Sequence, residues 1–300
     1  MTPKSPAGIP DEGRPAGLLV RISHWALARI LFQASALLVT IIVTSRLLNP
    51  VFPPAAPSAG LAVLRRLTEA GLLLGLYALL IRWMEHRSAT ELGLRQGAAQ
   101  LPAGAALGVA MMAAVQLVLW MLGLAAFGPG TGLGGLVAGA AAFLAAVFEE
   151  LLFRAVLFRI VEQACGTTVG LAVSAATFGL AHSFNPGATL FSDAAIAIEA
   201  GLMLALAFAV TRNLWFAIGI HAGWNFAEGD LFGVPVSGGA APHSLIRATL
   251  HGPELLTGGA FGPEASVIAM GVSAIVSIVF VVLVLRGSDW RPRALRLTLA

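Results

Sequence analysis

Long apolar runs, separated by short polar segments, dominate the sequence. Runs of about 20 apolar residues have the length that an α-helix needs to cross the hydrocarbon core of a membrane. The pattern therefore predicts an all-α fold, a polytopic membrane protein with about eight transmembrane helices that enclose a polar cavity. The predicted helices cover residues 26–48, 66–84, 101–126, 134–160, 168–189, 193–211, 213–230 and 265–286.

The composition supports a membrane protein. Hydrophobic residues make up 58% of the chain and charged residues only 11%, whereas a soluble domain carries roughly 25% charged residues. The high isoelectric point, near 10.0, comes from arginines between the apolar runs. Proteins that read nucleic acids cluster such residues on one face, so we expect a lipid bilayer and no nucleic acid as a partner. The single Cys165 excludes an intrachain disulfide.

Positive charges alternate between the connections and predict the orientation. Cytoplasmic connections carry the excess of Lys and Arg, and the connection 231–264 contains only one such residue, Arg247. Both termini are therefore expected in the cytoplasm, and the Ala, Gly and Arg content with short loops favours a bacterial inner membrane. The expected parts are a cytoplasmic tail (1–25), N-terminal helices (26–126), a core (134–230), an extracytoplasmic loop (231–264) and a last helix with a basic cytoplasmic tail (265–300).

Glycines four residues apart predict close helix packing. Small residues at this spacing let two helix backbones approach each other in lipid. Glycine is also simply common in membrane helices, so any single pair is weak evidence. The pairs are Gly104/Gly108, Gly135/Gly139 and Gly219/Gly223.

Two adjacent carboxylates, Glu149 and Glu150, interrupt the apolar stretch AAFLAAVFEELLFRAVLF. Each acidic residue near the centre of a membrane helix costs about 2.5–3.5 kcal/mol, and such residues usually mark a functional site. Adjacent helical positions point about 100° apart, so the two cannot face one small site. Glu150 and Arg154 have the i,i+4 order of a helical ion pair, which leaves Glu149 as the carboxylate facing the interior. The alternative is that both glutamates only hold helices together.

Histidines on the next helices add groups that can exchange protons. His182 shares a helix face with Phe178, and His221 shares one with Asn225. An imidazole can accept a proton, hold a water or bind a metal, and an amide beside it suits stabilisation of an oxyanion. Phe178 is expected to pack and to shape the pocket. A further buried acid, Glu199, is expected either to pair with a polar group such as Arg212 or to line the cavity.

Several other enzyme and transporter classes lack their motifs here. The sequence contains no His-Glu-x-x-His helix, which zincin-type metalloproteases use. It also has no Gly-x-Gly-Asp of presenilin-type aspartyl proteases, no rhomboid-type Gly-x-Ser-Gly and no Walker loop.

The order Glu-Glu-x-x-x-Arg, Phe-x-x-x-His and His-x-x-x-Asn resembles the CPBP family. Its members include the CAAX prenyl endopeptidases and the bacterial bacteriocin-processing and self-immunity (ABI) proteins. The resemblance covers roughly residues 134–230, and the segment TELGLR (90–95) resembles one that precedes the family core. It implies an eight-helix membrane fold with a cavity open to the cytosol and hydrolysis of a membrane-associated peptide or protein substrate.

The resemblance also implies roles for individual residues. Glu149 would activate the attacking water with His182 as its partner, while His221 and Asn225 would bind the oxyanion or organise the water. Glu150, Arg154 and Phe178 would be supporting residues.

Whether a metal takes part stays open at this point. Members of the family are often labelled metalloproteases, and Glu149, His182 and His221 could hold Zn²⁺ with a water as fourth ligand. Glu149 would then be a ligand, and only Glu150 would be left to act as a base. A mechanism in which Glu149 is the base needs no metal and is equally compatible with these residues.

The expected function is therefore that of an intramembrane endopeptidase. A non-catalytic immunity or peptide-binding protein of the same fold is the main alternative. A proton-coupled transporter is a further alternative, in which Glu199 would matter as much as Glu149.

Overall fold

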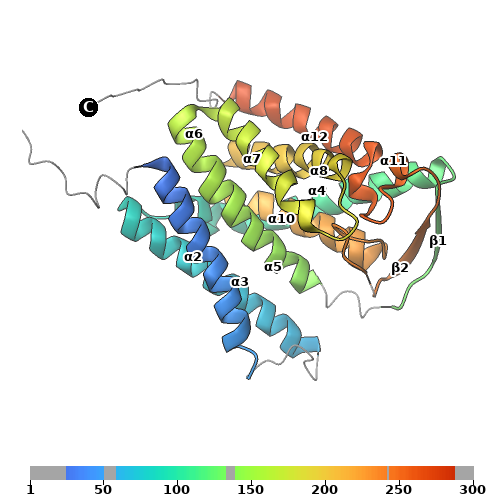
Figure 1. Cartoon of the computed structure of the whole chain (residues 1–300), viewed down its shortest axis with the longest axis horizontal. Helices are drawn as coiled ribbons and strands as arrows, with labels where there is room; N and C mark the ends of the chain where they lie inside the picture. Colours follow the sequence, from blue (N-terminus) through green and yellow to red (C-terminus); the bar gives the residue numbers. More distant parts are fainter. Residues whose placement is uncertain (1–24, 51–58, 133–138, 242, 288–300) are drawn as a thin grey trace, which may run out of the picture.

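The computed structural model describes residues 25–50, 59–132, 139–241 and 243–287. Within these ranges the chain is mostly helical and forms the elongated bundle of Figure 1. The predicted tail 1–25, apart from Trp25, and the predicted basic tail after residue 287 lie outside the described residues.

Eight helical rods make up the described part of the bundle, and four of them are built from consecutive helical segments. The rods are α2 (Ala26–Leu47); α3 (Ala59–Glu85); α4 (Leu94–Met121); α5 (Gly139–Glu150) with η3 (Leu151–Phe158) and α6 (Arg159–Cys165); α7 (Thr167–Ala181) with η4 (His182–Phe184); α8 (Leu190–Ile196) with η5 (Ala197–Leu202) and α9 (Met203–Thr211); α10 (Leu214–Asn225) with η6 (Phe226–Leu231); and α12 (Val267–Arg286).

Short elements connect the rods. Three of them are single helical turns, and two are the strands of a small antiparallel pair at the end of the bundle where α11 and β1 are labelled in Figure 1. They are η1 (Thr90–Leu92), α11 (Glu254–Thr257), η7 (Pro263–Ala265), β1 (Ala125–Pro129) and β2 (Ile246–Leu250).

Five of the described helices are long and apolar enough to cross a membrane. They cover residues 26–47, 60–85, 94–121, 190–211 and 267–286. These helices support a polytopic, helical membrane protein, and the count of eight spanning helices stays a prediction.

Two of the predicted helices have wrong boundaries. The predicted helix 101–126 runs from Leu94 to Met121, and residues 125–129 form β1 instead. Gly123 has a left-handed backbone (φ 71°), a conformation that commonly ends helices. The predicted helix 66–84 begins at Ala59, because Arg65 and Arg66 both pair with Glu69 inside the helix. Arg65 and Arg66 interrupt the apolar run in α3, and Arg95 and Gln96 make the first turn of α4 polar, so apolar runs alone placed both starts too late.

The glycine pairs of α4 and α10 hold these two helices in backbone contact. A Cβ atom at Gly108 would lie 2.7 Å from the backbone nitrogen of Trp224, and one at Gly223 would lie 2.8 Å from Cα of Ala105. Such distances leave no room for a side chain, so the predicted close approach is confirmed for this pair of helices. Gly139 packs against Phe226, whereas Gly135 lies outside the described residues. The contact fixes the position of α10, the helix that carries His221.

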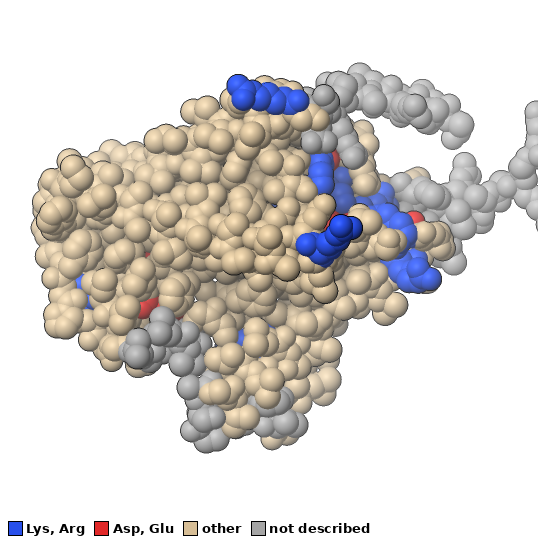
Figure 2. All heavy atoms as spheres, turned by 180° about the vertical axis from the view of Figure 1, so that it is seen from behind, with Lys and Arg blue, Asp and Glu red and all other residues tan. Residues whose placement is uncertain are grey.

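Charged side chains are distributed unevenly over the surface. On the face shown in Figure 2, most of the Lys and Arg atoms gather toward one end of the bundle, and the described surface elsewhere is mostly tan. Arg29 of α2 and Arg159 at the start of α6 both pair with Glu85 at the end of α3, and Arg212 lies in the turn between α9 and α10.

The close contact between α4 and α10 predicts the effect of a single methyl group. We expect Gly108→Ala to lower the melting temperature of the purified protein in detergent, because overpacking typically costs about 1–3 kcal/mol. Gly75→Ala is the matched control, since nothing lies within 4 Å of a Cβ at Gly75 in α3. Equal melting temperatures for the two variants would contradict the proposed tightness of this contact.

Candidate active site

A buried ion pair lies at the centre of the bundle. Nη1 of Arg154 donates to Oε1 of Glu150 at 2.8 Å, and both side chains are fully buried. Arg154 also donates to the carbonyl oxygens of Ala200 (2.9 Å) and Gly201 (3.3 Å), and its guanidinium lies 4.4 Å from the ring centroid of Phe178. The predicted pair therefore exists, and it joins the rod of α5 to the rods of α7 and α8.

π-helical segments surround this ion pair. η3 begins directly after Glu150 and contains Arg154, while η5 contains Glu199 and the carbonyl acceptor Ala200. π-helical turns are rare in proteins and occur frequently at functional sites. No pattern in the sequence indicated them.

His221 connects the ion pair to Glu149. Nδ1 of His221 lies 2.9 Å from Oε1 of Glu150, and Nε2 lies 3.8 Å from Oε2 of Glu149. Because an ionised carboxylate only accepts hydrogen bonds, Nδ1 carries a hydrogen and donates a hydrogen bond to Glu150. The second distance is too long for a direct hydrogen bond.

Glu149 has a carboxylate oxygen that is buried without a hydrogen-bond partner. That atom is Oε2, the one facing His221, whereas 25% of the side chain as a whole is accessible. Buried polar atoms are nearly always paired with protein or water. Both glutamates meet the ring of His221, contrary to the expectation that they cannot face one small site, but only Glu150 is also held by Arg154. One oxygen of each glutamate, Oε2, is buried without a hydrogen-bond partner.

His182 is oriented by its own helix. It follows the last residue of α7, and its Nδ1 lies 2.8 Å from the carbonyl oxygen of Phe178. The carbonyl can only accept, so Nδ1 donates and Nε2 remains as an acceptor. The ring of Phe178 lies 4.8 Å from that of His182 and 6.1 Å from that of His221, measured between centroids. Phe178 therefore packs against both histidines, as its predicted supporting role requires.

Several of the predicted site residues line one small cavity. Its volume is about 20 Å³, and a cavity needs roughly 10–15 Å³ to hold one water. Glu149 is not part of the lining and approaches the cavity at Nε2 of His221. The polar lining consists of His182, His221, Asn225, Glu199, Ser237 and Glu264.

Glu199 lines this cavity, in agreement with one of its two expected roles. Its Oε2 accepts a hydrogen bond from Ser273 at 3.1 Å. The alternative partner, Arg212, instead pairs with Glu162 at 2.5 Å. That expected contact is wrong, because the turn before α10 directs Arg212 toward α6.

The loop after α10 contributes residues that the sequence reading missed. Glu264 accepts a hydrogen bond from the backbone N–H of Ser237 at 2.6 Å, and its own N–H donates to Glu228 at 3.3 Å. Burial raises the pKa of Glu264, and the hydrogen bond from Ser237 opposes this rise. The sequence signal for Glu264 was that this acid follows a glycine-rich segment. In the structure, Gly258, Gly259 and Gly262 of that segment have positive φ. The predicted loop 231–264 thus reaches the cavity.

The predicted Zn²⁺ site requires three ligand side chains close to one another. In the ranges that the structure covers, no three His, Cys, Asp or Glu side chains are placed to share a metal ion. The Nδ1 atoms of both histidines are engaged in other contacts, which leaves Nε2 of each ring as the atom that could bind a metal. Glu149, His182 and His221 therefore do not form a three-ligand group in this structure, and the Zn²⁺ site stays a prediction.

Fold and site together describe a helical membrane protein with carboxylates, histidines and an amide gathered inside the bundle. Residues 114–227 match the family model described as type II CAAX prenyl endopeptidase, Rce1-like. The matched segment contains Glu149, His182, His221 and Asn225, and it confirms the family that the three motifs indicated, which suggests a membrane protease. No curated protein and no solved structure matches the chain.

The unequal roles of the two glutamates predict unequal effects on folding. We expect Glu150→Gln to destabilise the protein by about 3–5 kcal/mol, since removing one partner leaves a buried charge on Arg154. Glu149→Gln should melt close to the wild type, because no hydrogen bond or close ion pair is lost. Melting temperature and yield in detergent measure both effects, and a larger loss for Glu149→Gln would reverse the assignment.

Proposed function

We propose that this protein is an intramembrane endopeptidase that hydrolyses a peptide bond in a membrane-proximal segment of a peptide or protein substrate. The observation that carries the proposal is the buried, unpaired Oε2 of Glu149 facing Nε2 of His221 at 3.8 Å. A carboxylate without a partner beside an imidazole is suited to hold and deprotonate a water. The proposal agrees with the protease family of the matched segment.

In the proposed mechanism, Glu149 removes a proton from a water whose oxygen attacks the carbonyl carbon of the substrate. The C–O bond forms, and the carbonyl oxygen becomes an oxyanion. When the tetrahedral intermediate collapses, the C–N bond breaks and the proton on Glu149 passes to the leaving nitrogen. The products are a carboxyl terminus and an amine, and Glu149 is again ionised.

Asn225, His182 and His221 assist this sequence. The amide of Asn225 lines the cavity one helical turn after His221 and is proposed to donate to the oxyanion, an interaction typically worth about 2.7–4 kcal/mol in enzymes. Nε2 of His182 is proposed to accept a hydrogen bond from the attacking water. Glu150 and Arg154 act indirectly, since their pair fixes the ring of His221.

The proposal also includes an alternative cofactor and a membrane location. A Zn²⁺ ion held by Glu149, His182 and His221 is the alternative cofactor, and a metal-free mechanism is equally compatible with these residues. The proposed location is a bacterial inner membrane with both termini on the cytoplasmic side. The arginines at one end of the bundle (Figure 2) support this orientation through the positive-inside rule.

The proposal predicts that Glu149→Gln abolishes hydrolysis. Wild type and variant would be purified in detergent and incubated with a peptide library, and new termini would be identified by mass spectrometry. We expect a loss of at least about 100-fold, as general-base catalysis typically contributes about 10²–10⁴-fold. Glu254→Gln, on the exposed α11, is the matched control and should retain activity within about twofold.

Three outcomes would separate the alternatives. Full activity of Glu149→Gln would contradict its role as the base. If no protein cleaves any peptide although wild type and variant bind the same peptides, a non-catalytic peptide-binding function is favoured. If Glu199→Gln abolishes proton-coupled transport in vesicles and no peptide is cleaved, the transporter is favoured.

A further inference from the structure

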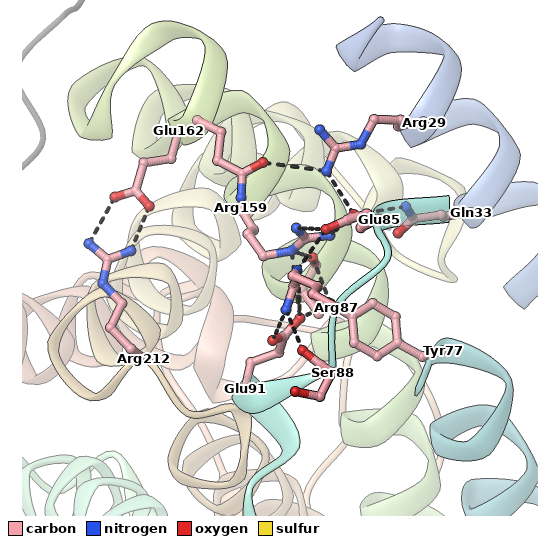
Figure 3. A network of polar contacts seen from close by, with 12 residues as sticks. Arg29, Gln33, Tyr77, Glu85, Arg87, Ser88, Glu91, Arg159, Glu162 and Arg212 are labelled. Atoms are coloured by element: carbon pink, nitrogen blue, oxygen red, sulfur yellow. Dashed lines mark hydrogen bonds and ion pairs between the residues drawn. The ribbon is translucent and has the colours of Figure 1, made fainter. Parts of the chain in front are cut away.

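Arginines and glutamates form a network at the end of the bundle where α3 ends and α6 begins (Figure 3). Glu85 accepts hydrogen bonds from Arg29 at 2.7 Å, from Arg159 at 2.8 Å and from Arg87 at 2.9 Å. Arg87 also donates to both carboxylate oxygens of Glu91, at 2.8 and 2.9 Å. These contacts bring together α2, α3, the segment before α4 and α6.

A second ion pair lies on the other side of the same end. Arg212 donates to both carboxylate oxygens of Glu162, at 2.5 and 3.1 Å. Figure 3 shows this pair to the left of the Arg87–Glu91 pair. Arg212 has a left-handed backbone (φ 51°) in the turn that precedes α10, and Glu162 lies one helical turn after Arg159 in α6.

A pocket of about 210 Å³ lies between the two groups. At about 30 Å³ per water molecule in the liquid, this volume corresponds to roughly seven waters, which is enough for a phosphate group with a short substituent. Side chains of both ion-pair groups line it, together with a hydroxyl: Arg87, Thr90, Glu91, Arg159, Glu162 and Arg212.

The charged side chains that line the pocket have a net charge of one positive unit. Three arginines face two glutamates, and adding their neighbours Arg29 and Glu85 leaves that excess unchanged. The charges persist over a wide pH range. Burial alone would raise the pKa of Glu91, but the hydrogen bonds from Arg87 and Tyr77 hold it below its ordinary value. The contacts of Arg87 with Glu91 and Glu85 raise its pKa.

The pocket also lies at the depth expected for lipid headgroups. The apolar helix α3 can cross a membrane over residues 60–85, so Glu85 marks its polar boundary. The side chains of Arg87 and Arg212 are 32% and 29% accessible, and both can therefore be reached from outside. Guanidinium groups match phosphate oxygens with paired hydrogen bonds, and basic pockets between membrane helices on the cytoplasmic side bind lipid headgroups.

We propose that this pocket binds the phosphodiester of a singly anionic glycerophospholipid, of which phosphatidylglycerol is the example. Arg87 and Arg212 would hold the phosphate oxygens, and Thr90 and Glu91 would accept or share hydrogen bonds with the hydroxyls of the headgroup. A headgroup with a quaternary ammonium would add a second positive charge to a site that already has an excess. The site would therefore distinguish anionic from zwitterionic lipids.

The test adds soluble, short-chain lipids to the full-length protein in detergent. Melting temperature and binding would be measured with dihexanoyl phosphatidylglycerol, with dihexanoyl phosphatidylcholine and with inorganic phosphate. A ligand that binds the folded state raises its melting temperature. We expect this rise with phosphatidylglycerol alone.

Two substitutions in the pocket should change the Kd for phosphatidylglycerol in opposite directions, which would place the binding there. Arg212→Gln should raise the apparent Kd for phosphatidylglycerol about tenfold, which corresponds to the loss of one charged hydrogen bond. Glu162→Gln should lower it, because a carboxylate no longer competes with the phosphate. Arg286→Gln removes a charge from the exposed last residue of α12 and should leave the Kd within about twofold.

A purely structural network predicts that Arg212→Gln and Glu162→Gln both lower the melting temperature without any lipid preference, and that result would overturn the site. Equal effects of phosphatidylglycerol and phosphatidylcholine would overturn it as well. If inorganic phosphate protects as strongly as phosphatidylglycerol, with the same dependence on Arg212, the lipid proposal is overturned in favour of free phosphate.

Discussion

The arrangement of the candidate site depends on one buried ion pair, that of Glu150 and Arg154. Isolated charges inside a membrane are costly, so this arginine is neutralised by the carboxylate and further bonded to the carbonyls of Ala200 and Gly201. The same carboxylate holds His221. These contacts fix three rods relative to one another. Glu149 meets the same imidazole only at Nε2, the opposite ring nitrogen, and makes no ion pair with Arg154.

Helix packing and loop contacts beyond the ion pair also position the residues of the candidate site. The glycines of α4 and α10 allow a backbone contact that sets the position of His221 and Asn225. On another side, the loop that follows α10 supplies Ser237 and Glu264 to the cavity. At the arginine-rich end, α6 continues the rod of Glu149 and Arg212 precedes the helix of His221 (Figure 3). The proposed lipid pocket therefore adjoins both helices on which the proposed chemistry depends.

Local patterns explain what could be predicted from the sequence. Apolar runs predicted the rods, and the i,i+4 spacings predicted the Glu150–Arg154 pair and the shared face of His221 and Asn225. The π-helical segments had no such pattern, and neither had the strand pair β1–β2, which joins residues far apart in the chain. The roles of Glu264 and of the Arg212–Glu162 pair depend on tertiary contacts, and the matched family segment ends before Glu264.

The central claim is that Glu149 activates a water rather than attacking the substrate itself. It can be tested by a single turnover of a cleaved peptide in ¹⁸O-labelled water, followed by mass spectrometry of the product and of the protein. The account predicts one ¹⁸O atom in the new carboxyl terminus and none in Glu149. An unlabelled product, with ¹⁸O in the Glu149 carboxylate after hydrolysis of an acyl intermediate, would contradict it.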